Sequence, residues 1–264
     1  MFDEDRTYIM GVLNVTPDSF HDGGKFIDFN LAVEHAKQMI QDGADIIDVG
    51  GESTKPGSDP VSEEEEINRV IPVIEKLSSL DVIISIDTSK PKVAELALNA
   101  GAHIINDVTG LNNGMREVAA KHKCPVIIMH MKGKPKNMQK DIVYDDVVSE
   151  IKEFLAGRVK LAKEVGINDI FIDPGIGFGK ELKHNLELIR RLNEFNEIAP
   201  VLLGVSRKSF IGKLIGEENT SERLEGSLSA NVIGIMNGAK IIRVHDVKES
   251  KRAALIADSI KWQK

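Results

Sequence analysis

Carboxylate, amide and basic side chains follow the apolar segments of this sequence, and their types could bind a flat polar ring together with an anionic group. Asp87, Asn106 and Asp173 are short side chains that accept or donate hydrogen bonds in fixed directions, which suits a planar heterocycle with several N–H and C=O groups. The basic side chains are Lys208, Arg243 and His245. Such donors hold phosphate or diphosphate groups. The sequence therefore indicates a site for a heterocycle that carries a diphosphate.

Asn14 stands at the end of "YIMGVLNV", directly before a break in the apolar pattern. Its side-chain oxygen could bind a Mg2+ ion that accompanies a diphosphate, because Mg2+ prefers oxygen ligands. The simpler interpretation is a local turn, since Asn often accepts a hydrogen bond from the backbone two residues further on. Both roles are open for Asn14 taken alone.

Eight short, β-branched apolar segments carry these residues. They span residues 8–15, 45–51, 82–88, 103–109, 125–131, 170–175, 200–206 and 240–246. They alternate with longer amphipathic stretches, as consecutive βα units of a parallel sheet do, and eight such units predict an α/β fold, a single (β/α)8 TIM barrel. The polar residues that end the segments are Asn14, 52–54, Asp87, 106–107, His130, Asp173, 206–208, Arg243 and His245. A turn or a helix cap explains any one of them, but strand ends in such a barrel converge on one mouth, so we expect one shared site.

The amphipathic stretches have clear helix signals. Ser62 and Glu65 have the spacing of a capping box, and the first turn that follows is acidic. The longest predicted helix spans about residues 145–166. Because no linker or low-complexity tract divides the series, we predict one domain over residues 1–264.

The composition limits the possible partners. The 264 residues carry a formal net charge of −7, which argues against a basic nucleic-acid surface. No stretch approaches the roughly 20 apolar residues that a membrane-spanning helix needs. The first six residues lack the basic-then-apolar order of a signal peptide, and the single cysteine, Cys124, excludes an internal disulfide. We therefore expect a cytoplasmic protein.

Two common motif types fail on inspection. "GIGFGKE" follows an apolar segment, but its glycines are spaced GxGxG, and Pro174 and Glu181 stand where a Walker motif needs Gly and Ser or Thr. The seven histidines show no HExxH or similar spacing, so zinc is not expected, and an ordinary surface position is expected for His184 among others. His130 could line the mouth or close its strand.

Several motifs in order resemble the dihydropteroate synthase family of pterin-binding enzymes. They are "MGVLNVTPDSFHDGG", "DIIDVGGESTKPGSDPVSEEEEINRV", "SIDTSKPKVAELALNAGAHIINDVTG", "PVIIMHMKG", "FIDPGIGFGK", "GVSRKSFIG" and "RVHDV". The resemblance implies a TIM barrel that joins 6-hydroxymethyl-7,8-dihydropterin diphosphate to 4-aminobenzoate, which gives 7,8-dihydropteroate and diphosphate. It also implies Mg2+ as cofactor, a homodimer and inhibition by sulfonamides.

The family's residue roles carry over by position. The pterin-binding residues would be Asp87, Asn106, Asp173, Lys208 and Arg243. The catalytic residues among them would be Asp87, Lys208 and Arg243. The diphosphate-binding residues would be Asn14, Thr54, Arg243 and His245, with Asn14 also at the metal ion. The 4-aminobenzoate site would be formed by Thr54, Pro56, Phe178, Lys208 and Ser209. One departure is Lys55, which stands where the family commonly has arginine and lacks its planar fork.

Two alternatives remain open from the sequence. A methyltetrahydrofolate:corrinoid methyltransferase shares the Asp and Asn side chains that bind the ring, but "ESTKPG" and "RVHD" suit diphosphate and 4-aminobenzoate better. A catalytically silent barrel that serves as a subunit would need lost site residues, whereas all of them are present in the sequence.

Overall fold

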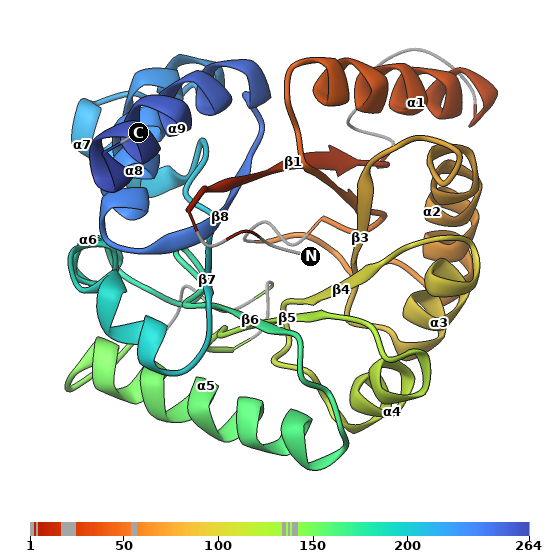
Figure 1. The fold of residues 1–264 in the computed structure, drawn as a ribbon, viewed down its shortest axis with the longest axis horizontal. Coiled ribbons are helices and arrows are strands. Elements are labelled where there is room, and N and C mark those ends of the chain that lie inside the picture. The colour runs from red at the N-terminus through yellow and green to blue at the C-terminus, as the bar shows by residue number, and fades with distance from the viewer. Residues whose placement is uncertain are drawn as a thin grey trace.

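The computed structural model describes residues 3, 5–16, 25–53, 57–133, 136, 138 and 142–263, and for residues 25–28 it describes only the backbone. Its described strands are parallel and close into a barrel, in which each strand pairs with the next along the chain and the last pairs with the first (Figure 1). They are β1 (Tyr8–Asn14), β2 (Ile46–Gly50), β3 (Ile83–Asp87), β4 (Ile104–Asp107), β5 (Val126–Met129), β6 (Ile170–Asp173), β7 (Val201–Leu203) and β8 (Ala239–Val244). The predicted TIM barrel and its eight strands are confirmed.

Helices surround the barrel and fill the crossovers between consecutive strands (Figure 1). They are α1 (Lys25–Gln41), α2 (Glu63–Leu77), α3 (Pro91–Asn99), α4 (Asn113–His122), α5 (Val147–Glu164), α6 (Leu182–Arg190), α7 (Ser209–Ile215), α8 (Leu224–Met236) and α9 (Val247–Trp262). Two short 3-10 helices, η2 (Leu192–Glu197) and η3 (Thr220–Arg223), precede β7 and α8. Within the described part of the chain, no helix has the length and apolar character needed to cross a bilayer.

Helix ends follow the local sequence. The Ser62 side chain accepts a hydrogen bond from Glu65 N at the start of α2, but Glu65 Oε1 pairs with Arg69, so only the Ser62 half of the predicted capping box is confirmed. The predicted helix at 145–166 is α5, which begins after Asp146, whose carboxylate accepts from two backbone N–H groups of the first turn.

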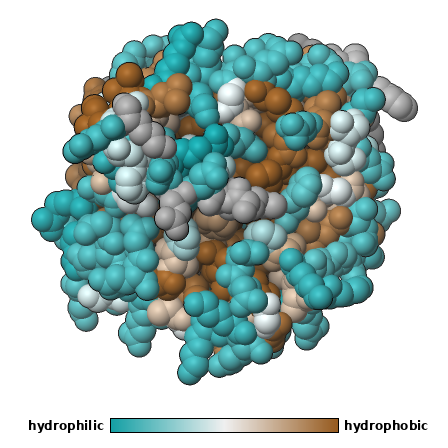
Figure 2. Space-filling view, in the orientation of Figure 1, coloured by the Kyte–Doolittle hydropathy of each residue, from teal (hydrophilic) through white to brown (hydrophobic). Residues whose placement is uncertain are grey.

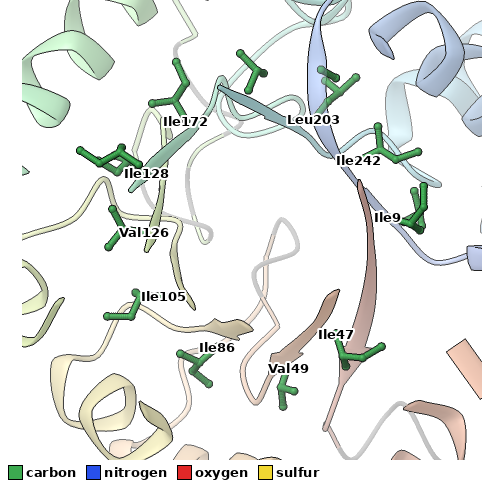
Figure 3. Close-up of a cluster of buried hydrophobic side chains, with 14 of the residues drawn as sticks. Ile9, Ile47, Val49, Ile86, Ile105, Val126, Ile128, Ile172, Leu203 and Ile242 are labelled. Carbon is green, nitrogen blue, oxygen red and sulfur yellow. The ribbon is translucent and has the colours of Figure 1, made fainter. Parts of the chain in front are cut away.

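The strands are buried on both faces, which explains why they are apolar almost throughout. Side chains that point outward from the barrel pack against the helices; Figure 3 labels Ile9, Ile47, Val49, Ile86, Ile105, Val126, Ile128, Ile172, Leu203 and Ile242 among them. A second buried cluster fills the inside of the barrel and consists of Tyr8, Met10, Ile46, Ile104, Ile127, Phe171, Leu202 and Ile241. We call this second cluster the apolar floor.

Polar residues lie one pleat above the apolar floor. Successive side chains of a strand alternate between its faces, so the residue two positions after a floor residue also faces the barrel interior. By this rule Asp48 follows Ile46, and the strand register places Asp87 beside Asn106. The other members are Asp173, which follows Phe171, and Arg243, which follows Ile241. The carboxyl ends of the strands thus bring these polar side chains together at one mouth.

Candidate active site

Arg243 reaches from β8 to carboxylates on two other strands. Its Nε donates to Asp48 Oδ2 on β2 at 2.6 Å, and its Nη2 donates to Asp87 Oδ2 at the end of β3 at 2.7 Å. The side chain of Arg243 is 24% exposed, whereas those of Asp48 and Asp87 are 0% and 8% exposed. One cation therefore faces two buried carboxylates, and charge-assisted hydrogen bonds fix the orientation of its guanidinium.

Asp48 also connects Asn106 to this group. Asn106 Nδ2 donates to Asp48 Oδ2 at 3.0 Å. Sequence reasoning missed Asp48, because it lies inside a strand rather than at its end. The usable signal was an acidic residue in the middle of "DIIDVGG", where a fully buried charge is rare unless it has a partner.

Burial and the neighbouring charges determine the pKa values of Asp87 and Arg243. Burial raises the pKa of the Asp87 carboxyl to about 7, and the neighbouring Asp48, Glu66 and Asp107 carboxylates act in the same direction while Arg243 opposes them. Burial opposes the charge of Arg243, but Asp48 and Asp87 hold its pKa above the ordinary value. Arg243 is therefore always charged, whereas Asp87 titrates near neutral pH.

Asp173 and Lys208 form the other side of the mouth. Asp173 Oδ1 accepts from Gly175 N at 2.7 Å, and burial raises the pKa of Asp173 against the attraction of Lys208. Burial also lowers the pKa of Lys208 to about 8, which Asp173 opposes. Lys208 Nζ donates to Ile176 O and lies 4.7 Å from the centre of the Phe178 ring. The predicted ring-binding residues and the predicted 4-aminobenzoate residues are thus neighbours.

The glycines of "GIGFGK" serve backbone packing. Gly175 and Gly179 have φ angles of 70° and 66°, in the left-handed region that favours glycine. A β-carbon on Gly175 would overlap the backbone oxygen of His130, and one on Gly179 would overlap that of Lys132. The loop between β6 and α6 can therefore pass directly against the end of β5, and this accounts for the first and last of its three glycines.

Lys180 fixes the same loop from inside, and sequence reasoning did not single it out. Its buried Nζ donates to Phe178 O at 2.9 Å and lies 3.0 Å from His130 Nδ1. Burial lowers the pKa of Lys180 well below its ordinary value, and burial together with the Lys180 charge lowers the pKa of His130 to about 3. The His130 ring also packs edge-on against Phe154 of α5, with 5.0 Å between the ring centres. His130 is therefore neutral at pH 7 and closes its strand.

The loops after β7 and β8 are tied together. Arg207 Nε donates to Asp246 Oδ2 at 3.0 Å, with a second bond from Nη2 to Oδ1, and Arg207 itself has a positive φ of 57°. His245 N donates to Ser206 Oγ at 3.2 Å, and His245 Nδ1 lies 3.1 Å from the same oxygen. These contacts set the position of His245, which is half-buried, relative to the loop that carries Lys208.

Other predicted strand-end residues have local roles. Asp107 accepts from Thr109 N at 2.7 Å and from Leu111 N at 3.0 Å, which is turn chemistry. Glu52 pairs with Lys90. The expected surface position of His184 is wrong, because its ring is buried and accepts from Glu181 N in a capping box at the start of α6.

Comparison with known proteins decides the family. The model of the family described as "Pterin binding enzyme" matches residues 10–245. A dihydropteroate synthase of Clostridium beijerinckii is 49% identical over 97% of this chain and 95% of its own length, and one of Escherichia coli K12 is 49% identical over 97% and 93%. The chain belongs to the dihydropteroate synthase family.

Solved structures of dihydropteroate synthases agree. One from Yersinia pestis, in a complex with a sulfonamide drug, superposes with a TM-score of 0.93 at 46% identity and covers 99% of this chain and 96% of its own. One from Xanthomonas albilineans with 4-aminobenzoic acid has a TM-score of 0.92 at 42% identity, over 97% and 94% of the two chains. The resemblance inferred from the sequence motifs is confirmed.

In this member of the dihydropteroate synthase family, the residues predicted to bind the metal ion and 4-aminobenzoate lie only partly within the described part of the chain. A β-carbon placed on Gly50 would lie 3.7 Å from Asp87 Oδ2 and 3.9 Å from Asn14 Oδ1, so Asn14 stands beside the Asp87 end of the mouth. The described residues contain no cluster of three or more His, Cys, Asp or Glu side chains that could hold a metal ion. Mg2+ often keeps several waters and binds through one protein oxygen plus substrate phosphates, so a single Asn14 amide fits it.

Of the remaining residues predicted for the 4-aminobenzoate site, some are described by the structure and some are not. Thr54 and Pro56, together with Lys55, lie outside the described residues. Ser209 is exposed at the first position of α7, directly after Lys208.

Proposed function

We propose that the protein is a dihydropteroate synthase of folate biosynthesis, which transfers the pterinylmethyl group of 6-hydroxymethyl-7,8-dihydropterin diphosphate to 4-aminobenzoate. The observation that carries the proposal is the group of polar side chains above the apolar floor. Carboxylates and an amide from β3, β4 and β6 face the mouth beside Arg243 and Lys208. This arrangement supplies directional hydrogen bonds for a planar ring and positive charge for its leaving group.

The pterin ring would be held by Asp87, Asn106 and Asp173. Their side chains project from strands and are held by hydrogen bonds, so the ring would be oriented by groups that already face the mouth. Asp87 in its ionised form would stabilise the positive methylene that develops as diphosphate departs. Lys208 and Arg243 would complete the ring site, with Arg243 stacking on the ring.

The diphosphate would bind at Arg243, His245 and Asn14, joined by Thr54. The guanidinium of Arg243 is held by carboxylates, so it can present its remaining N–H groups to the phosphate oxygens. A Mg2+ ion bound at Asn14 would neutralise negative charge on the leaving group. His245 is held against Ser206, which places its imidazole beside the loop that follows β7.

4-Aminobenzoate would bind against Phe178, Lys208 and Ser209, and the family resemblance also assigns Thr54 and Pro56 to this site. Lys208 is mostly protonated at pH 7, because its pKa is about 8, and it lies over the Phe178 ring. The arylamine is neutral at pH 7 and attacks without a strong base, so the residues around it need only position it. Sulfonamides would occupy the same place.

The experiment is product formation, followed by mass spectrometry, from the pterin diphosphate and 4-aminobenzoate with and without Mg2+. Arg243→Ala should weaken binding of the pterin diphosphate more than binding of the same pterin without diphosphate. If neither substrate is consumed, or if methyl transfer to a corrinoid is found instead, the proposal fails.

We further propose a cytoplasmic homodimer. Exposed apolar side chains gather on α7, α8 and α9, where the surface is brown at the upper left of Figure 2; they include Leu214, Ile215, Ile233, Met236, Leu255, Ile256 and Ile260. A patch of this kind is typical of an interface between subunits. Sedimentation equilibrium should give the mass of two chains, and a single-chain mass would refute it.

A further inference from the structure

Asp48 is a charged residue in a place that the fold would normally fill with an apolar side chain. It lies in the middle of β2, it is fully buried, and the interior residue two positions before it is Ile46 of the apolar floor. Burying a carboxylate is costly unless it is paired and hydrogen-bonded. The contacts of Asp48 should therefore explain why it is there.

Its contacts are with residues of the proposed pterin site. Asp48 Oδ2 accepts from Arg243 Nε on β8 at 2.6 Å and from Asn106 Nδ2 on β4 at 3.0 Å. The other oxygen, Oδ1, is buried and has no hydrogen-bond partner among the described residues. One oxygen of Asp48 thus fixes two ring-binding side chains that come from different strands.

The second carboxylate that Arg243 contacts belongs to Asp87, which the proposed function assigns to pterin binding. Arg243 Nη2 donates to Asp87 Oδ2 at 2.7 Å, and the proposed function gives Asp87 to the N–H groups of the pterin. When pterin takes that oxygen, the bond from Nη2 must be exchanged. The bond from Nε to Asp48 lies deeper in the barrel, on a fully buried carboxylate, and it can remain in place.

We propose that Asp48 is a positioning residue that keeps Arg243 anchored through Nε while its Nη2 exchanges Asp87 for the substrate. The inference rests on the proposed function, because it takes Arg243 and Asp87 as substrate-binding residues. Asp48 acts through Arg243 and Asn106 and does not touch the reacting atoms. It also keeps a negative charge beside Arg243 when Asp87 is engaged with the ring, so the cation is never left buried without a counter-ion.

The test is a double-mutant cycle on the steady-state kinetics of the full-length protein. Asp48→Asn keeps the shape of the side chain and removes its charge, Arg243→Ala removes the group that Asp48 holds, and the double variant measures their coupling. Ser85→Ala is the matched control, because Ser85 lies on β3 at the register position of Asp48, and its buried Oγ has no hydrogen-bond partner among the described residues.

The expected result is a loss specific to the pterin substrate. Asp48→Asn should lower kcat/KM for the pterin diphosphate by about tenfold or more, and the KM for 4-aminobenzoate at saturating pterin should stay within about twofold. In the Arg243→Ala background the same change should cost no more than about threefold, since Asp48 would have only Asn106 left to hold. Ser85→Ala should behave as the unmodified protein.

Three results would overturn the inference. Additive effects of Asp48→Asn and Arg243→Ala would show that Asp48 does not act through Arg243. Equal losses for both substrates, with an unchanged pterin KM, would show a loss of folded protein. If Asp48→Asn does not fold, Asp48→Ser replaces it; failure of both to fold while Ser85→Ala folds would make Asp48 a requirement of the fold. Full activity of Arg243→Ala would instead refute the proposed function.

Discussion

Asp87→Asn should make the protein more stable and less active, and the gain in stability should depend on pH. In the folded protein the pKa of Asp87 is about 7, mainly because of burial, whereas its ordinary value is 3.8. The ionised carboxylate is therefore disfavoured by folding. The variant removes this carboxylate, and Arg243 keeps Asp48 as its counter-ion.

The magnitude follows from the difference between the two pKa values of Asp87. Below pH 3.8 the carboxyl is protonated in both the folded and the unfolded chain, so it does not lower the free energy of unfolding. As the pH rises from 3.8 to about 7, only the unfolded chain ionises, and stability falls. One pKa unit corresponds to about 1.4 kcal/mol, so the full effect is about 4 kcal/mol, of which about 2 kcal/mol appears between pH 5 and pH 7, where the folded carboxyl is already half ionised.

Urea unfolding at pH 5, 6, 7 and 8 measures this directly. The free energy of unfolding of Asp87→Asn, relative to the unmodified protein, should rise by about 2 kcal/mol from pH 5 to pH 7 and then level off. Asp81→Asn removes an exposed carboxylate and serves as the control for loss of one charge. A difference that stays constant across this pH range would refute the reasoning. Calorimetric titration should show weaker pterin binding by Asp87→Asn.

Further predictions concern the loop after β6 and helix α8. Gly175→Ala should unfold or aggregate, because the new β-carbon would overlap the backbone oxygen of His130 at a φ of 70°; a normal melting temperature would contradict this. Lys180→Met should raise the KM for 4-aminobenzoate more than that for the pterin, since Lys180 holds the backbone of Phe178, and equal KM changes would exclude this role. Asn231→Leu should raise the free energy of unfolding by about 1–3 kcal/mol, because both amide atoms of Asn231 are buried without hydrogen-bond partners among the described residues; thermal unfolding tests it.

The sequence predicted the barrel because its signal repeats. Parallel strands buried on both faces are apolar along their length, and eight such segments that alternate with helical stretches predict one closed architecture. The boundaries were less exact: the segment at 200–206 contains only β7 (Val201–Leu203), and the chain then turns at Arg207, whose positive φ is held by the Asp246 pair. That contact joins residues far apart in the sequence, so no local pattern could show it.

The site was predictable where a polar residue ends a strand and less so elsewhere. Asp87 and Asn106 stand at strand ends and face the mouth, but the adjacent Asp107 has the same character in the sequence and makes a turn instead. Which of two neighbouring polar residues points inward depends on the strand register. Asp48 was missed because its role comes from Arg243, which lies 195 residues further along the chain.

The apolar floor has a consequence for the design of inhibitors. Below Asp48 the interior is filled by Met10, Ile46, Ile104 and other apolar side chains, so a compound cannot gain affinity by extending deeper into the barrel. New contacts must come from the loops around the mouth. A variant that resists such an inhibitor would therefore arise in the loops around the mouth, at little cost in stability. A substitution in the apolar floor would instead lower the stability of the whole barrel, because residues from nearly all of its strands pack there.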